Sequence, residues 1–435
     1  MTPAARLSAA IGILEALQTQ KRPLATVLKE WGAANRYAGS GDRNAVGNIV
    51  HDSLRVKASA AWRAGDRSTD PAPRAILLGM LRGMRGMRVE DIGNLCSGER
   101  FAPAPLSDEE RVSLTANGIT DAPANVRGDY PEWLDASFAR AFGAERVDEL
   151  SAMAARAPID LRVNPLKIIR LKALEALGHL EPEETPLSPY GLRIRPNAEG
   201  RVPHVQSEPA FLKGAVEVQD EGSQLVSLLA GAQPGMQVLD LCAGGGGKTL
   251  AMAGEMNNKG QIFATDSDQR RLAPIHDRLT RAGVRNVQVR TPKNGVMDLK
   301  DIAGKMDLVL VDAPCTGTGT WRRHPDAKWR MRPNSLDLRT SEQHEVLDHA
   351  ATHVKPGGRL VYITCSLLDE ENGAQVVSFL NRHADFSVTD PAANAEARSL
   401  PALASFTDCR KLGLLLTPRR TNTDGFFIAV LNRST

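Results

Sequence analysis

From Gly214 to the end of the chain, short apolar segments rich in β-branched residues alternate with segments of helical periodicity. The expected strands are MQVLDLC, QIFATD, NVQVR, DLVLVD, RLVYIT and GFFIAVL. Such an alternation is typical of a doubly wound α/β fold with a parallel sheet. Because GLLLTP precedes the last strand closely, we expect this sheet to end in an antiparallel pair. Ligands of such sheets bind beyond the carboxyl ends of the strands, so residues that directly follow a strand are the candidate site.

Two further domains are expected before this sheet, in a chain of 435 residues that is long enough for several cores. Residues 1–128 show helical periodicity, as in RLSAAIGILEALQ and GNIVHDSLRVKASAAW, and predict a helical bundle. Residues 129–213 mix helical segments with the short strands of DLRVNPLK, YGLRIRP and GAVEVQD, and predict a small α+β module. Residues 214–435 then form the α/β domain.

Composition narrows the class of protein. The chain holds 42% hydrophobic and 24% charged residues, and neither an apolar run of membrane-spanning length nor a secretory pattern is visible, so we expect a cytoplasmic protein without a membrane partner. The five cysteines are widely spaced without a CxxC pair, which argues against a metal site or a disulfide framework. A net charge of +3 fits a protein that binds a polyanion, and equally many enzymes with neutral substrates. No obligate protein partner is inferred.

The run VLDLCAGGGGKT predicts a strand, a glycine loop and the start of a helix around a cofactor. A phosphate-binding P-loop would need glycine where Cys242 stands, and a dinucleotide fingerprint would need it at Thr249. S-adenosylmethionine carries no phosphate and suits the short loop of residues Cys242, Ala243, Gly244, Gly245, Gly246 and Gly247. Asp266 ends the next strand, where it either accepts hydrogen bonds from ribose hydroxyls or caps the helix expected over 267–282. Asp240 could assist near the amino-acid end of the cofactor.

Two cysteines follow strands, Cys315 in DAPCTGTG and Cys365 in VYITCS, and a helix rich in early acidic residues is expected after the second. Cys96, Cys242 and Cys409 are expected to be inert. One reaction that needs a nucleophilic cysteine is the methylation of carbon-5 of cytosine, in which a thiolate adds to carbon-6 and is later eliminated. Asp312 could bind the edge of an extruded base through a protonated carboxyl, or only cap its strand.

At these residues the chain resembles the Sun family of RNA cytosine-5 methyltransferases. VQDEGSQ, DLCAGGGGKT, VDAPCTGTG followed by RRHPDAKW, ITCSLLDEEN and the terminal GFF are similar to that family's ordered motifs. The resemblance implies a Rossmann-like S-adenosylmethionine-dependent methyltransferase in which Cys365 is the nucleophile and Cys315 aids product release. DNA cytosine-5 methyltransferases use the opposite cysteine, so this assignment rests on family likeness.

The same resemblance implies roles for further residues. Asp312 would contact the cytosine, and Lys248, Asp266 and Arg271 would lie around the cofactor, with Asp312 at the border of both. VQVRTPKNG lacks the acidic residue that the family places near the adenine, which leaves that contact unassigned.

Candidate RNA contacts come from a basic segment and from the module before the sheet. The segment after Cys315 contains Arg322, Arg323, Lys328 and Trp329, and it predicts a loop that binds phosphates and stacks on bases, or a merely solvated charged loop. Arg162 lies in DLRVNPLK, which resembles the family's RNA-binding module. The helical start is similar to the NusB-type domain of the family's bacterial 16S ribosomal RNA member, which favours ribosomal over transfer RNA. A non-catalytic assembly factor and a nicotinamide-dependent oxidoreductase are the alternatives.

Overall fold

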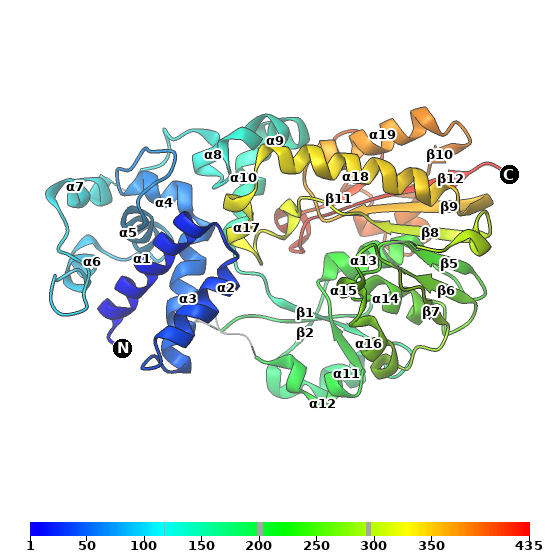
Figure 1. Cartoon of the computed structure of the whole chain (residues 1–435), viewed down its shortest axis with the longest axis horizontal. Helices are drawn as coiled ribbons and strands as arrows, with labels where there is room; N and C mark the ends of the chain where they lie inside the picture. Colours follow the sequence, from blue (N-terminus) through cyan, green and yellow to red (C-terminus); the bar gives the residue numbers. More distant parts are fainter. Residues whose placement is uncertain (117, 198–202, 293–296) are drawn as a thin grey trace. The chain divides into compact units, whose positions relative to one another are not determined.

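The protein is described by a computed structural model over residues 1–116, 118–197, 203–292 and 297–435, and it divides into two compact units (Figure 1). The helical unit comprises residues 1–156 and 321–331, and the sheet unit comprises residues 157–320 and 332–435. This division differs from the expected boundaries at 128 and 213. Residues 129–156 lie in the helical unit because Tyr130 and Phe138 are buried there, with their rings edge to face at 5.1 Å.

The helical unit is built from amphipathic helices whose apolar faces share one core. That core includes Leu14, Val50 and Leu77, each at most 2% exposed. The first helix begins where Thr2 accepts a hydrogen bond from Ala5 N and ends at Lys21, which has a positive φ. The helices are α1 (Pro3–Gln20), α2 (Leu24–Ala34), α3 (Ser40–Arg55), α4 (Lys57–Arg63), α5 (Pro73–Gly83), α6 (Val89–Leu95), α7 (Asp108–Ala116), α8 (Ala124–Arg127), α9 (Asp135–Phe142), α10 (Arg146–Ser151) and α17 (Pro325–Arg330).

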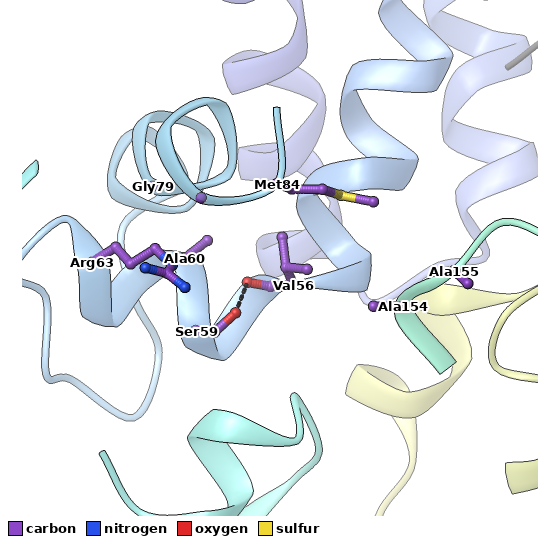
Figure 2. Close-up of a pocket in the computed structure, with 9 residues that line it drawn as sticks. Val56, Ser59, Ala60, Arg63, Gly79, Met84, Ala154 and Ala155 are labelled. Atoms are coloured by element: carbon purple, nitrogen blue, oxygen red, sulfur yellow. Dashed lines mark hydrogen bonds between the residues drawn. The ribbon is translucent and has the colours of Figure 1, made fainter. Parts of the chain in front are cut away.

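Helices α4 and α5 pack closely because a glycine lies at their contact. A Cβ atom at Gly79 would lie 1.8 Å from the carbonyl oxygen of Ala60, so no larger residue fits without separating the helices. Figure 2 shows both residues beside a pocket of about 300 Å³, which Arg63 and Met84 also line. The contact between Gly79 and Ala60 thus fixes the distance between the two helices, and residues of both helices line the pocket.

Residues 321–331 form part of the helical unit, although they follow Cys315 by only a few positions. Trp321 is 1% exposed and meets Phe138 edge to face at 5.9 Å. Lys328 donates to the carbonyl oxygens of Arg55 at 2.8 Å and Asp129 at 2.7 Å. Asp326 accepts a hydrogen bond from Leu24 N at the start of α2. This segment therefore completes the helical core.

The expectation of an exposed basic loop in this segment is wrong for most of its residues. Arg322 and Lys328 are each 2% exposed, and Trp329 donates its indole N–H to Leu54 O. Arg323 is partly buried. A guanidinium or ammonium group enclosed by its own protein cannot reach a phosphate without unfolding the contact, so these residues are structural in this conformation.

The sheet unit begins with a four-stranded antiparallel sheet, the core of the expected α+β module. The strand order is β2 (Glu183–Glu184), β3 (Gly191–Ile194), β1 (Ile159–Val163), β4 (Val216–Val218), and the accompanying helices are α11 (Arg170–Ala176) and α12 (Pro209–Leu212). Arg193 forms a buried two-bond ion pair with Asp160, and the carboxylate of Glu221 lies 3.3 Å from the same guanidinium. This pairing satisfies charges that burial would otherwise penalise.

The main sheet confirms the predicted α/β fold. Its order is β10 (Phe386–Val388), β12 (Phe426–Arg433), β9 (Val354–Thr364), β8 (Met306–Asp312), β5 (Gln237–Asp240), β6 (Gln261–Ala264) and β7 (Val287–Val289), with β11 (Leu414–Leu416) paired to β12. Strands β9, β8, β5, β6 and β7 are parallel, and β12 runs antiparallel to β9, β10 and β11. The expected antiparallel pair therefore exists, but β12 lies inside the sheet between β9 and β10.

Helices flank this sheet because its central strands bury apolar residues on both faces. Val238, Leu308 and Val361 of three neighbouring strands are each 0% exposed within one core. The helices are α13 (Glu221–Ala230), α14 (Gly247–Glu255), α15 (Gln269–Leu272), α16 (Ile275–Ala282), α18 (Pro333–Ala351), α19 (Gly373–Arg382), α20 (Pro391–Ala397) and α21 (Pro418–Thr421).

The strand order reverses between β5 and β8. The chain runs from β5 through β6 to β7 on one side, and then crosses to β8 on the other side. At such a switch point the loops beyond the two strands diverge and leave room for a ligand. Within the described residues, no helix combines the length and apolar character needed to cross a membrane.

Candidate active site

The glycine loop leaves β5 at its carboxyl end and leads into α14. Gly244 and Gly246 have positive φ values of 50° and 83°, and a Cβ at Gly246 would lie 2.5 Å from Ile275 Cγ1. Arg278 donates to Gly245 O at 2.5 Å and so braces the loop from α16. The sequence correctly predicted a strand, a glycine loop and a helix here, and the backbone follows a path that side chains would block.

Asp266 lies beside this loop and is 1% exposed. Its carboxylate oxygens accept hydrogen bonds from Gly244 N and from Asp268 N, both at 2.9 Å. Asp268, rather than Asp266, caps α15, since its side chain accepts from Arg270 N. The expected helix over 267–282 is two helices, because Pro274 separates α15 from α16. Arg271 extends over the site, with its Nη1 3.6 Å from Asp266 Oδ2.

Asp240 ends β5 with its side chain fully buried. Thr249 donates to its Oδ2 at 2.6 Å, whereas its Oδ1 has no hydrogen-bond partner among the described residues. Burial raises the pKa of Asp240 to about 7. Burial also raises the pKa of the Cys242 thiol well above its ordinary value, as do the nearby carboxylates of Asp266, Asp240 and Asp312, so that thiol stays neutral. An unpartnered buried oxygen in a negative field fits a cationic ligand group.

The two cysteines singled out in the sequence meet at the neighbouring strand ends. Cys315 follows β8 and Cys365 follows β9, and their Sγ atoms are 3.3 Å apart. The parallel register that pairs Asp312 with Ile363 brings the two strand ends level. Contact with Cys365, burial and the negative charge of Glu371 raise the pKa of Cys315 well above its ordinary value. The Cys315 thiol therefore stays protonated at neutral pH.

Asp312, three residues before Cys315, pairs with Lys248, which follows the glycine loop. Lys248 Nζ donates to Asp312 Oδ2 at 2.6 Å. The same ammonium lies 5.3 Å from the ring centre of Phe426, the first phenylalanine of the terminal GFF motif. Lys248 is largely buried while the Asp312 side chain is 33% exposed, so the carboxylate forms the accessible side of the pair.

The terminal motif also supports the cysteine loop through a glycine pair. Gly425 N donates to Gly319 O at 2.7 Å, and a Cβ at Gly319 would lie 2.3 Å from Gly425 O. Gly319 N in turn donates to Cys365 O at 2.9 Å. These backbone contacts require glycine on both sides and hold DAPCTGTG against the end of β9.

The structure thus brings together Cys315, Cys365, Asp312, Lys248 and the glycine loop. Arg162 does not join them. It is 5% exposed and lies near Pro165, Tyr190 and Glu255, and its Nε has no hydrogen-bond partner among the described residues. The sequence placed it on an RNA-binding surface, but burial within the module removes it from direct contact in this conformation. Residues 293–295, the last three of VQVRTPKNG, lie outside the described residues, so the adenine contact stays unassigned.

Sequence reasoning assigned no role to Glu371 and did not notice Gln343. Glu371 accepts hydrogen bonds from the loops of both cysteines, and Gln343 of α18 donates to it at 3.1 Å. The run DEEN was visible after Cys365, but the expected helix there begins only at Gly373. A short 3₁₀ turn over Asp369–Glu371 comes first and turns Glu371 inward.

Comparison with known proteins agrees with the motifs. Residues 227–432 match the family described as 16S rRNA methyltransferase RsmB/F. A Synechocystis protein named "Probable ribosomal RNA small subunit methyltransferase B" is 31% identical over 87% of this chain and 80% of its own length. An Enterobacter protein named "Ribosomal RNA small subunit methyltransferase B" is 35% identical over 71% of this chain and 68% of its own.

A solved structure is similar in fold to most of this chain. The methyltransferase homolog protein from Pyrococcus horikoshii matches with a TM-score of 0.58 and 27% identity, over 71% of this chain and 97% of that one. The matched family and the two named relatives agree with the resemblance of the ordered motifs. The chain therefore belongs to the 16S rRNA methyltransferase RsmB/F family, within the Sun family.

Proposed function

We propose that this protein transfers a methyl group from S-adenosylmethionine to carbon-5 of a cytosine in 16S ribosomal RNA. The observation that carries the proposal is the pair of thiols 3.3 Å apart beyond the carboxyl ends of β8 and β9, at the same edge of the sheet as the ion pair of Lys248 and Asp312. Carbon-5 of cytosine is too weak a nucleophile to be methylated directly, so this reaction needs a thiol, whereas most other methyl transfers do not.

The cofactor would lie against the glycine loop, between Asp240 and Asp266. The unpartnered Oδ1 of Asp240 suits the ammonium group, and the oxygens of Asp266 retain lone pairs for ribose hydroxyls. When bound, S-adenosylmethionine supplies an electrophilic methyl group on a positively charged sulfur. The carboxylates of Asp240, Asp266 and Asp312 lie around the loop. They favour binding of the positively charged cofactor over binding of the neutral molecule that remains after methyl transfer.

In the proposed chemistry, the Cys365 thiolate forms a bond to carbon-6 of the cytosine, and the displaced electron pair makes carbon-5 nucleophilic. The pair of Lys248 and Asp312 would bind the edge of an extruded base and offset the charge that develops on the ring. After methylation, loss of the carbon-5 proton to a base restores the double bond and releases Cys365. The raised pKa of Cys315 supports its role as the neutral partner that assists this release.

Cofactor affinity is expected to rise with pH. Since the pKa of Asp240 is about 7, its carboxyl is mostly neutral at about pH 6 and mostly ionised at about pH 7.5. A cationic ligand binds the ionised form more tightly, and Lys248, Asp266 and Asp312 are the other charged groups that face Asp240. Calorimetric titration with S-adenosylmethionine should show several-fold tighter binding at the higher pH, and Asp240→Asn should flatten this dependence. Affinity that falls or stays constant in the unaltered protein would contradict the role of Asp240.

The RNA target follows from the relatives, two of which are named as small-subunit ribosomal RNA methyltransferases. A ribosomal RNA substrate supports a cytoplasmic location for the proposed activity. Bisulfite sequencing of total RNA from a deletion strain tests the target: a 16S cytosine that resists conversion in the parent strain should become fully converted. Loss of a mark in transfer RNA alone would reverse the substrate assignment, and no lost mark would contradict cytosine methylation.

A further inference from the structure

Glu371 connects the two cysteine loops through its carboxylate. The side chain is 0% exposed. One oxygen accepts the backbone N–H of Thr316 at 2.8 Å, and the other accepts the hydroxyl groups of Thr316 and Ser366. Thr316 directly follows Cys315, and Ser366 directly follows Cys365. A single carboxylate therefore binds the neighbour of each thiol.

Further hydrogen bonds anchor Glu371 itself. Gln343 donates to its Oε1 at 3.1 Å and to Pro314 O at 2.9 Å, on the other side of Cys315. Tyr362 of β9 donates its hydroxyl to Glu371 O at 2.6 Å. Glu371 is thus held by α18 and β9, and its carboxylate can in turn hold the two loops in place.

The sheet alone does not fix the thiols. Its ladder between β8 and β9 ends at Asp312 and Ile363, while Cys315 lies three residues past that point. Beyond the ladder, Gly319 N donates to Cys365 O, and Thr318 and Glu371 provide further hydrogen bonds between the two loops. Loops that carry reacting groups need such support, because a displacement of about 1 Å can lower a rate by about 10²-fold.

We propose that Glu371 is a positioning residue for methyl transfer: its carboxylate sets the separation and orientation of Cys315 and Cys365. This inference rests on the proposed function, but the geometry that it predicts can be measured without any RNA. Burial places Glu371 out of reach of a substrate, so it acts through the two loops.

The donors divide between the two oxygens in a way that provides a sharp test. Oε1 receives only N–H donors, from Thr316 and Gln343, and Oε2 receives only hydroxyls, from Thr316 and Ser366. A glutamine amide can present its oxygen to the first pair and its NH₂ to the hydroxyls, which accept as well as donate. Glu371→Gln therefore keeps the connections and removes the charge, whereas Glu371→Ala removes both.

Oxidation of the thiols by the azo compound diamide reports their separation. Two thiols form one disulfide, and their two protons and two electrons reduce the N=N bond of diamide to a hydrazine. We expect rapid formation of the Cys315–Cys365 disulfide in the unaltered protein and in Glu371→Gln, and slowing of about tenfold or more in Glu371→Ala. The product is measured after trypsin without reductant, as the linked peptides of residues 306–322 and 360–382.

A matched control changes a residue at the start of β8, the strand whose other end leads to Cys315. Asp307 accepts a hydrogen bond from Gln237 N and pairs with Lys355 at the start of β8, so Asp307→Ala removes a carboxylate without touching the loops. Oxidation in this control should match the unaltered protein. If Glu371→Ala oxidises as fast as the control, the inference is wrong. If Glu371→Ala does not fold, Ser366→Ala replaces it, and oxidation of Ser366→Ala at the unaltered rate overturns the proposal.

Kinetics distinguish positioning from proton transfer. Glu371→Ala should lower kcat for RNA methylation by about 10²-fold with little change in KM, and Glu371→Gln should recover most of that loss. A glutamine variant as slow as the alanine variant would show that the charge is required, and would overturn the inference. Absence of RNA methylation by the unaltered protein, together with the expected oxidation pattern, would instead reject the proposed function and retain the positioning role.

Discussion

Replacement of Cys365 by alanine is expected to abolish methylation of RNA, with a loss on the order of 10⁴-fold or more, the scale on which nucleophile removal acts. Without the sulfur no bond to carbon-6 forms, and carbon-5 stays unreactive. Transfer of tritiated methyl groups to 16S ribosomal RNA measures the effect. The variant should still bind S-adenosylmethionine, because Asp240 and Asp266 are unchanged.

Replacement of Cys315 should have a different consequence, which makes it the matched control. If Cys315 assists release, Cys315→Ala should form the bond between Cys365 and the base but break it slowly. A complex of protein and RNA should then persist through denaturing gel electrophoresis and disappear in the variant with both changes. A persistent complex in Cys365→Ala instead would exchange the roles of the two cysteines.

Trp321→Ala is expected to destabilise the helical unit by about 3–5 kcal/mol, since it removes a large side chain that is 1% exposed against Phe138. Urea unfolding followed by circular dichroism should show an earlier helical transition. Because Trp321 belongs to the helical unit, cofactor binding by the sheet unit should be preserved at low urea concentration.

Arg330→Ala provides the control for that measurement. Arg330 is the last residue of α17, within the same segment of residues 321–331 as Trp321, and it pairs with Asp326 at 3.0 Å with its side chain 35% exposed. Such a pair contributes about 1 kcal/mol or less. Equal effects of Trp321→Ala and Arg330→Ala would show that residues 321–331 are not part of the helical core.

The sheet and the thiol site could be predicted because their signals are local. Apolar strands separated by helices define the fold, and a cysteine just after a strand must lie at the carboxyl edge of a parallel sheet. The structure agrees at Cys315, Cys365, Asp312 and the loop around Gly244. The position of β12 was not predicted, because the sequence alone does not show which strand an antiparallel partner will join.

The roles of the basic segment and of Glu371 depend on contacts between distant parts of the chain. Arginine, lysine and tryptophan together suit an RNA-binding loop, yet the same residues can bury their long side chains and donate to carbonyl groups, as Lys328 does to Arg55 and Asp129. Glu371 stands in an acidic run, and such runs are usually exposed to solvent. Its contact with Thr316 exists only in the folded chain. No pattern within either segment distinguishes these alternatives.

The most direct test of the account is to trap the covalent intermediate on 16S ribosomal RNA that contains 5-fluorocytosine. Fluorine at carbon-5 cannot leave as a proton does, so elimination stops and the enzyme stays bound to the base. After digestion with trypsin and ribonuclease, mass spectrometry identifies the modified peptide. The account predicts a methylated fluorocytosine on Cys365, in the peptide of residues 360–382. Modification of Cys315, in the peptide of residues 306–322, or no covalent product, would contradict it.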